Sequence, residues 1–321
     1  MALPVTAAYY VALRNPARLP EILRFAHAQG LPICVLGGGS NVIFRGDYPG
    51  LVIHLLNQGI TLQTTQDDMV RVHVAAGEQW DDFLQVCLRR HWFGLENLAM
   101  IPGTVGAAPV QNIGAYGQEV AECIEAVHCV NRHTLTEHQF QARDCQFAYR
   151  DSLFKSQAAD TFIITAVDFQ LHTTPNLNLT YQPLAALFPD QSPTPMQLRQ
   201  AVMNIRASKL PDPKQLANSG SFFKNPVVSA QTYQQLKAQY PAIPGYPTQG
   251  AVKLAAGWLI QHCGWKGKNI GPVGMYEKQA LVLVNYGGGT FSAVQVLLER
   301  VQQDVFDRFG VQLEQEPVMI Y

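Results

Sequence analysis

The segment that most constrains the fold is residues 101–120, IPGTVGAAPVQNIGAYGQEV. Its repeated glycines and its two prolines, Pro102 and Pro109, exclude a regular helix or strand, so we predict an extended loop. Apolar residues are interleaved along the segment, which argues against disorder. Long loops inside compact domains are typically functional, and we therefore expect this one to form a binding surface.

A second glycine-rich stretch, GGGSN at residues 37–41, follows an apolar run that predicts a strand. Consecutive glycines let backbone N–H groups converge on a phosphate without obstruction by side chains. An isolated glycine triplet is usually only a tight turn. The G-x-G-x-x-G dinucleotide fingerprint is also absent, because residue 42 is valine. Together with residues 101–120, however, the stretch favours a long ligand that carries a diphosphate.

The rest of the chain predicts a mixed α and β fold. Four segments show the apolar spacing of amphipathic helices: residues 17–29, 77–90, 252–263 and 293–309. We expect the last helix to begin at a capping box formed by Ser292 and Gln295. Because strands and helices do not alternate regularly, an α+β assembly of packed domains is favoured over one doubly wound sheet. The stretch LPDPKQ, residues 210–215, marks a domain boundary.

Composition excludes several classes of protein. The chain has 321 residues and a net charge of −1, so we expect no general surface for nucleic acid. No apolar stretch reaches the roughly 18 residues of a membrane span, and the N-terminus does not resemble a signal peptide, so we expect a cytoplasmic protein. The six cysteines form no C-x-x-C pair, which indicates reduced thiols. No sequence pattern predicts a metal site.

Two stretches offer polar side chains that chemistry could use. Taken alone, ANSGSFFKNP (residues 217–226) is a turn before a strand, with two candidate hydroxyls, Ser219 and Ser221. In YRDSLFK, the guanidinium of Arg150 suits a carboxylate or a phosphate. On this stretch alone, an ordinary surface ion pair with the neighbouring Asp151 is favoured instead.

The C-terminal stretch VQLEQEPVMIY predicts a strand, which would tie the tail into the fold. Glu314 and Glu316 would lie on the same face of this strand, so spacing does not choose between them. Several lysines between residues 209 and 268 could gather around an anionic ligand.

Eight stretches occur in the order that one known family shows: LGGGSNVIF (36–44), GLENLAMIPGTVGAAPVQNIGAYGQEV (94–120), YRDSLFK (149–155), KLPDPK (209–214), GSFFKNP (220–226), AAGWLIQHCGWKG (255–267), QALVLVN (279–285) and LEQE (313–316). Together they resemble the UDP-N-acetylenolpyruvoylglucosamine reductases of bacterial cell-wall precursor synthesis. No single stretch is decisive, but the ordered set is specific. The sequence departs from the family at Pro317 and Val318, where valine and then a basic residue are common.

The resemblance implies an FAD-binding domain of the vanillyl-alcohol-oxidase/PCMH-like type in two subdomains, residues 1–62 and 63–209. A C-terminal α+β domain, residues 210–310, would bind the nucleotide sugar, and the tail 311–321 would return to the first subdomain. FAD would be tightly bound by the two glycine loops, through Gly37, Gly38, Gly39, Ser40, Asn41, Pro102, Gly103, Thr104, Gly106, Gln111, Asn112, Gly114, Ala115 and Tyr116.

The resemblance also implies the reaction. With NADPH as donor, UDP-N-acetylglucosamine enolpyruvate would be reduced to UDP-N-acetylmuramate, with Ser221 protonating the substrate carbon while Arg150 and Glu316 meet its carboxylate. The substrate contacts would be Tyr181, Lys209, Asn225, Lys266 and Gln279. Tyr181 resembles the subtype that carries a tyrosine-bearing loop over the substrate, and the family favours a monomer.

Two alternatives remain from the sequence. One is another FAD-dependent sugar or alcohol oxidoreductase of the same fold, which would need neither a proton from Ser221 nor a UDP site. The other is a non-catalytic nucleotide-sugar-binding protein, which would take up no FAD.

Overall fold

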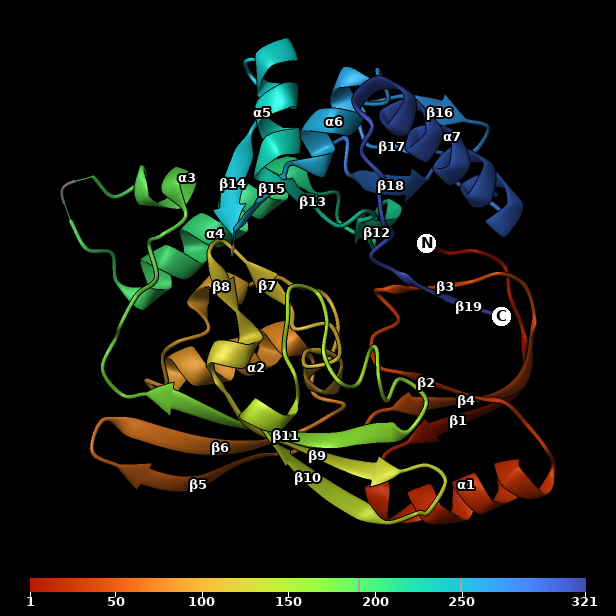
Figure 1. Ribbon diagram of the computed structural model, residues 1–321. Coiled ribbons are helices and arrows are strands. Elements are labelled where there is room, and N and C mark those ends of the chain that lie inside the picture. Colours follow the sequence, from red (N-terminus) through yellow and green to blue (C-terminus); the bar gives the residue numbers. More distant parts are fainter. Residues whose placement is uncertain (190, 249) are drawn as a thin grey trace. The chain divides into compact units, whose positions relative to one another are not determined.

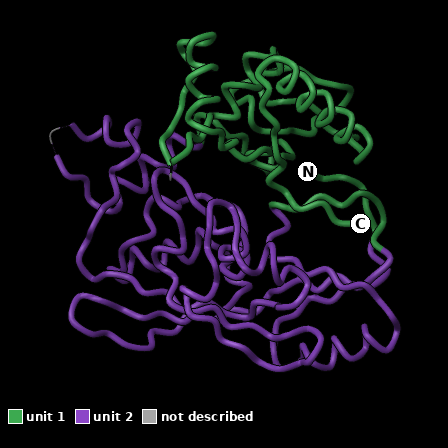
Figure 2. The backbone as a smooth tube through the Cα atoms, in the orientation of Figure 1, with its two compact units in different colours: residues 1–6, 41–48, 207–321 green, residues 7–40, 49–206 purple. Residues whose placement is uncertain are grey.

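The computed structural model describes residues 1–189, 191–248 and 250–321 (Figure 1). These residues form two compact units (Figure 2), of which unit 1 comprises Met1–Thr6, Asn41–Tyr48 and Ala207–Tyr321, and unit 2 comprises Ala7–Ser40 and Pro49–Arg206. Helices and mostly antiparallel sheets occur in both units, so the predicted α+β class is confirmed. The predicted division into three domains is finer than these two units and stays a prediction.

Unit 2 is built on a three-stranded sheet, in the order β1-β4-β2, and a five-stranded sheet, in the order β10-β9-β11-β6-β5. The strands are β1 (Ala7–Leu13), β2 (Ile33–Leu36), β4 (Tyr48–Leu55), β5 (Ile60–Gln66), β6 (Met69–Ala75), β9 (Ile124–Asn131), β10 (Glu137–Gln141) and β11 (Phe162–His172). The helices are α1 (Leu19–Ala28), α2 (Trp80–Arg89), α3 (Gln182–Ala185) and α4 (Pro195–Lys209), the last of which runs on into unit 1. Short 3-10 turns lie at Pro16–Arg18, Glu96–Leu98, Val120–Glu122 and Ala142–Asp144.

Helix α2 forms the core of unit 2 against the five-stranded sheet. Its predicted apolar face is confirmed, since Trp80 and Phe83 are almost fully buried and both pack on Phe169 of β11. The indole nitrogen of Trp80 donates a hydrogen bond to the Leu98 carbonyl at 2.9 Å. A buried Trp is thereby satisfied, and the chain that leads into the 101–120 loop is fixed to the helix.

Unit 1 contains a four-stranded sheet (β12-β18-β17-β16), a three-stranded sheet (β13-β15-β14) and a parallel pair (β19-β3). The strands are β3 (Val42–Phe44), β12 (Ala217–Ser221), β13 (Val227–Ser229), β14 (Gly245–Thr248), β15 (Ala251–Leu254), β16 (Asn269–Ile270), β17 (Val273–Met275), β18 (Val282–Asn285) and β19 (Val318–Ile320). The helices are α5 (Ala230–Gln239), α6 (Ala256–His262) and α7 (Phe291–Phe309). The predicted buried face of the last helix is confirmed, with Val294, Leu297, Leu298, Val301, Val305 and Phe309 all buried.

The helix predicted over residues 252–263 is wrong in its first turn. Residues 251–254 form β15, which pairs with β13 on one side and β14 on the other. Val252 and Leu254 are both buried on alternate positions of this strand, so two flanking strands override a pattern that also fitted a helix. The helix begins only at Ala256, and Gly264, with φ of 78°, follows its end as predicted.

The capping box predicted at Ser292 and Gln295 is also wrong. Helix α7 begins at Phe291, and its N-cap is Thr290, whose hydroxyl accepts a hydrogen bond from the Ala293 N–H at 3.3 Å. Ser292 and Gln295 have the spacing of a capping box, so the sequence pattern placed the cap two residues later than Thr290.

We expect Thr290→Ala to lower the free energy of unfolding by about 1 kcal/mol, because it leaves an N–H at the start of α7 without its partner. Ser292→Ala is the matched control and should stay within about 0.5 kcal/mol of the parent. The midpoint of urea unfolding measures both changes. An equal loss in the two variants would contradict the cap at Thr290.

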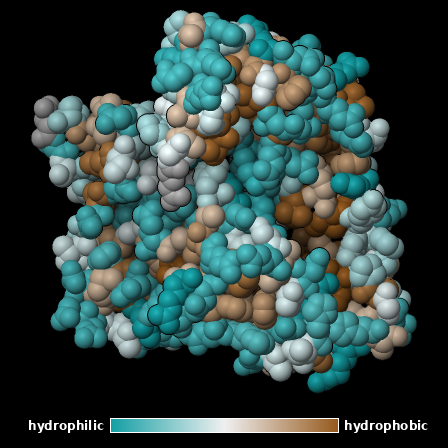
Figure 3. Space-filling model, in the orientation of Figure 1, coloured by the Kyte–Doolittle hydropathy of each residue, from teal (hydrophilic) through white to brown (hydrophobic). Residues whose placement is uncertain are grey.

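None of the helices in the described residues is long and apolar enough to cross a membrane. The face seen in Figure 3 is mainly hydrophilic, with apolar residues in separate patches.

The six cysteines are all free thiols, and all but Cys263 are buried. Burial raises the pKa of the Cys34 thiol to about 11, which keeps that thiol protonated and unreactive near neutral pH.

Candidate active site

The two glycine loops of the sequence lie against each other in unit 2. A Cβ atom on Gly37 would come within 2.3 Å of the Thr104 hydroxyl, and one on Gly38 within 2.9 Å of the Gly103 Cα. The Ser40 hydroxyl also donates a hydrogen bond to the Pro102 carbonyl at 3.1 Å. The loops can therefore approach backbone to backbone only because glycine stands at these positions.

Thr104 gives this paired surface an unusual feature. Its side chain is 2% exposed, yet no hydrogen-bond partner for its hydroxyl is found among the described residues. Buried hydroxyls are nearly always paired, so an unpaired one beside a glycine cradle marks a place for a missing polar partner. The cradle and the hydroxyl together fit the diphosphate of a dinucleotide. Asn41, the last residue of the first loop, belongs to unit 1.

Other residues predicted in the 101–120 loop have structural contacts of their own. Gly106 packs on Ala76, where a Cβ would come within 2.5 Å of the alanine Cβ. Asn112 is buried, donates to Glu119 at 2.7 Å and accepts from the Ala121 N–H at 3.1 Å. After the 3-10 turn Val105–Ala107, the loop ends in the hairpin of β7 (Gly114–Ala115) and β8 (Gln118–Glu119). The predicted loop is thus folded rather than merely extended.

The tip of this hairpin brings two predicted residues together. The rings of Tyr116 and Tyr181 meet edge to face, with centroids 5.4 Å apart. Burial raises the pKa of the Tyr116 hydroxyl, and a hydrogen bond with Arg206 opposes that shift. Tyr116 also has a left-handed backbone, with φ of 50°, a strained state for a tyrosine that is common at functional sites.

Arg206 is a residue that the sequence analysis missed. It lies on α4, burial lowers the pKa of its guanidinium, and Tyr116 and Asp81 counter that effect. Its Nε has no hydrogen-bond partner among the described residues. The sequence did offer a signal for Arg206. It lies four residues after Val202, which is buried, and therefore on the apolar face of a predicted helix.

Arg150 has a constrained conformation in unit 2. Its φ is 56°, and its guanidinium donates a hydrogen bond to the Gly114 carbonyl at 2.5 Å. The Lys155 ammonium donates to the Arg150 carbonyl at 3.1 Å. Left-handed backbone at a non-glycine residue costs about 1–3 kcal/mol and clusters at functional sites. The guanidinium is thus held beside the hairpin of the 101–120 loop.

The decapeptide 217–226 of unit 1 was predicted to be a turn before a strand. Its first half instead forms β12. Asn218 pairs with Val284 and Ser221 with Val282, so Ser219 and Gly220 form a bulge opposite a single residue of β18. Gly220 has a left-handed backbone with φ of 65°, a conformation that glycine adopts without strain. Ser219 is buried at 8% exposure, and its hydroxyl has no partner among the described residues, whereas Ser221 is exposed.

The C-terminal tail lies antiparallel beside residues 222–224, which directly follow β12. Phe223 and Gln315 pair across the two segments, and the Glu316 N–H donates to the Phe222 carbonyl at 2.8 Å. Glu316 is therefore next to the residue that follows Ser221. Glu314 instead forms an ion pair with Lys224, and its side chain is 70% exposed. The two glutamates thus have different surroundings, and the role of Glu316 stays a prediction.

The remaining predicted residues of unit 1 differ in their surroundings. Asn225 accepts a hydrogen bond from the Ala256 N–H at 3.0 Å, at the start of α6. Gln279 lies beside the same turn, since a Cβ on Gly257 would come within 2.9 Å of its Oε1. Lys209 and Lys266 are both exposed. The two amides are held in place, whereas the two ammonium groups lie at the surface of the described chain.

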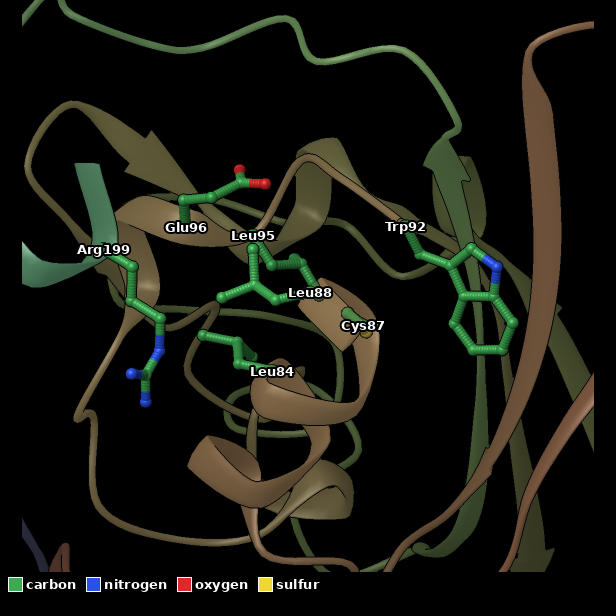
Figure 4. A pocket seen from close by; sticks show the side chains of 7 residues that line it. All are labelled: Leu84, Cys87, Leu88, Trp92, Leu95, Glu96 and Arg199. Atoms are coloured by element: carbon green, nitrogen blue, oxygen red, sulfur yellow. The ribbon is translucent and has the colours of Figure 1, made fainter. Parts of the chain in front are cut away.

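A small pocket in unit 2 contains no predicted site residue. Its lining is apolar apart from two charged groups, as Figure 4 shows: Leu84, Cys87, Leu88, Trp92, Leu95, Glu96 and Arg199. Arg199 donates to Asp81 at 2.7 Å, and the Glu96 carboxylate accepts from the Gly94 N–H at 3.0 Å. Both charges therefore already serve to fix neighbouring chain.

Known proteins resemble this chain along almost its whole length. Residues 212–320 match the C-terminal domain model of UDP-N-acetylenolpyruvoylglucosamine reductase, and residues 7–134 match the model of an FAD binding domain. UDP-N-acetylenolpyruvoylglucosamine reductases from Bdellovibrio bacteriovorus and Pseudomonas aeruginosa are each 46% identical to it. Those alignments cover 96% and 95% of this chain and 93% and 91% of the relatives.

A solved structure supports the same conclusion for the fold. The reductase of this name from Thermus caldophilus superposes with a TM-score of 0.66 at 23% identity, over 97% of this chain and 92% of the other. With relatives this similar over nearly their full length, this chain belongs to the UDP-N-acetylenolpyruvoylglucosamine reductase family, a family of FAD-binding oxidoreductases.

Proposed function

We propose that this chain reduces UDP-N-acetylglucosamine enolpyruvate to UDP-N-acetylmuramate, with FAD as cofactor and NADPH as hydride donor, in bacterial peptidoglycan precursor synthesis. The observation that carries the proposal is the pairing of the tail with residues 222–224, just after β12, in which the Glu316 N–H bonds to the Phe222 carbonyl at 2.8 Å. That pairing brings the backbone of Glu316 next to Phe222, the residue that follows the exposed Ser221.

FAD would be held by the paired glycine loops of unit 2. Gly37 and Gly38 let the two loops approach closely, and the unpaired hydroxyl of Thr104 would supply a polar partner for the diphosphate. When bound, FAD supplies hydride chemistry, since a flavin takes hydride from NADPH and passes it to a second substrate. Everything else in the reaction falls to side chains of this chain.

Ser221 is the proposed proton donor. Hydride addition to the enolpyruvyl methylene carbon leaves negative charge on the neighbouring substrate carbon and its carboxylate. A serine hydroxyl is a weak acid, but a carbanionic centre is a strong base, so the transfer can run downhill. The bulge at Gly220 supports this role, because it buries Ser219 and leaves Ser221 exposed at the end of β12.

Arg150 and Glu316 are proposed to meet the substrate carboxylate. A guanidinium stabilises charge that develops there, and its conformation is already fixed by the Gly114 carbonyl. A glutamate beside a carboxylate would repel it unless one of them were protonated. We therefore assign Glu316 the neutral form, in which its O–H donates a hydrogen bond.

The UDP-sugar would be bound by the side chains that the family motifs indicate. Lys209 and Lys266 offer two positive charges for a diphosphate. The amides of Asn225 and Gln279 lie near the start of α6 and have fixed positions. Tyr181, packed on Tyr116, matches the family position that would cover the substrate.

The proposed activity is tested with purified protein and NADPH. We expect a yellow protein that oxidises NADPH rapidly only when the enolpyruvyl UDP-sugar is added, apart from slow transfer to oxygen. Rapid NADPH oxidation that the sugar does not change would instead indicate another flavin oxidoreductase. A colourless protein that takes up no FAD would indicate a non-catalytic nucleotide-sugar-binding protein.

Gly38→Ala tests the flavin cradle. The new methyl group would lie 2.9 Å from the backbone of Gly103, so the loops must separate, at a cost of about 1–3 kcal/mol. We expect a lower FAD content, measured by the ratio of flavin to protein absorbance. Gly46→Ala is the matched control, since open space surrounds that position. Full flavin content in the Gly38 variant would contradict the assigned cradle.

A further inference from the structure

Two histidines and an aspartate meet on one face of the five-stranded sheet of unit 2. The Asp168 carboxylate is 5% exposed. One of its oxygens lies 2.6 Å from Nδ1 of His73, and the other lies 2.8 Å from Nε2 of His128. Both imidazoles reach the surface, with side chains 36% and 28% exposed. Two partly exposed imidazoles thus flank the buried Asp168 carboxylate.

Helix α2 covers one face of the five-stranded sheet (Figure 1), and the cluster lies on the other face. Val72 and Val74 of β6 are buried in the core with α2, and successive side chains of a strand point to opposite faces. His73, between these valines, therefore points away from that core. The proposed flavin loops pack on the α2 side, since Val105 belongs to the same core. The cluster is thus separate from the proposed active site.

Strand register fixes the three Cα atoms. His73 of β6 stands directly opposite Asp168 of β11, and His128 of β9 stands opposite Ala166, one diagonal step from the aspartate. Irregularities of the β9–β11 pairing occur on both sides, between Ile164 and Ala166 and between Asp168 and Phe169. Bulges re-aim side chains and recur beside functional sites. Side chains from three neighbouring strands thus meet at one point of the sheet.

The side chains match what a transition-metal dication requires. The candidate ligand atoms of all three residues lie within 4.8 Å of one another. Imidazole nitrogens and a carboxylate oxygen are common ligands of Zn²⁺ and Cu²⁺, at about 2.0–2.2 Å for zinc. Around a tetrahedral ion, ligand atoms lie about 3.3 Å apart, so the two imidazoles need to swing outward by about half an ångström. Their exposure allows this movement, and water can fill a remaining position.

The local charge also favours a cation. On the same face, Arg71 forms an ion pair with Glu125 and is thereby neutralised. Asp168 supplies a carboxylate to the cluster itself. We propose that His73, His128 and Asp168 form a binding site for a transition-metal dication, which would join β6, β9 and β11 across the sheet.

The test is calorimetric titration of the flavin-loaded, chelator-stripped protein with Zn²⁺. We expect one ion per chain and a rise in the melting temperature of the loaded protein. His73→Ala and His128→Ala should each weaken the affinity by at least about tenfold, since even the loss of outer-shell partners costs that much. Asp168→Asn should do the same, and the two histidine variants keep the test decisive if that variant fails to fold.

A second histidine pair supplies the matched control. The rings of His27 and His133 stack with centroids 6.4 Å apart elsewhere in unit 2, and the double variant His27→Ala/His133→Ala should bind Zn²⁺ like the parent. Loss of binding in this control would overturn the assignment. So would the absence of stoichiometric binding by the parent, or unchanged affinity in His73→Ala with a native circular dichroism spectrum.

Discussion

Ser221→Ala is expected to leave flavin reduction by NADPH nearly unchanged and to lower turnover by about 10²–10⁴-fold, the usual contribution of a positioned acid. In the proposed mechanism, the Ser221 hydroxyl is needed only in the second step, when the substrate carbon is protonated. Stopped-flow absorbance separates the two steps, because the flavin band bleaches with NADPH and returns with the enolpyruvyl UDP-sugar. Only the return should slow.

Ser219→Ala is the internal control for that result. The Ser219 hydroxyl is buried and unpaired in the described structure, so its removal should leave turnover unchanged and be neutral or slightly stabilising. Both serines lie in the same strand within two residues, which makes the comparison close. A turnover defect in the Ser219 variant with normal turnover in the Ser221 variant would refute the assignment.

Glu316→Ala is expected to lower kcat by about 10²–10³-fold, the range seen when one donor to developing negative charge is removed. Glu314→Ala should change kcat little, because its ion pair with Lys224 is exposed and contributes at most about 1 kcal/mol. Steady-state kinetics with the enolpyruvyl UDP-sugar measures both. Similar kcat values in the two variants would contradict the proposed role of Glu316.

Glu316→Gln refines the same prediction. If Glu316 acts as a neutral donor, an amide N–H can take over part of its hydrogen bond, so the glutamine variant should lose less activity than the alanine variant. A glutamine variant as impaired as the alanine variant would instead require the carboxyl group itself.

The sequence predicted the fold best where one period continues over many residues. The buried face of α7 was predicted residue by residue, because nineteen residues repeat one helical pattern. Residues 252–254 failed because three residues fit a helix and a strand equally well, and only pairing with β13 and β14 decides. The start of α7 failed because several hydroxyl residues stand near it and backbone geometry selects Thr290.

The candidate site was predictable wherever a motif carries its own geometry. The two glycine loops were expected to share a ligand, and their backbones do meet at Gly38 and Gly103. The sequence could not show that the tail pairs with residues 222–224, nor that Glu314 forms an ion pair with Lys224. The cluster at Asp168 could not be foreseen, because its residues lie far apart in the chain and only the register of three strands assembles them.

The composition of unit 1 bears on the order in which the protein folds during synthesis. Strand β3 pairs in parallel with β19, and Asn41 bonds to the Glu316 carbonyl across 275 positions of chain. The sheets of unit 2 can close as soon as β11 is made, whereas β3 must wait for the last strand. Contacts this distant in sequence form slowly, so nascent chains are expected to close the sheets of unit 2 before the C-terminal tail reaches β3 and residues 222–224.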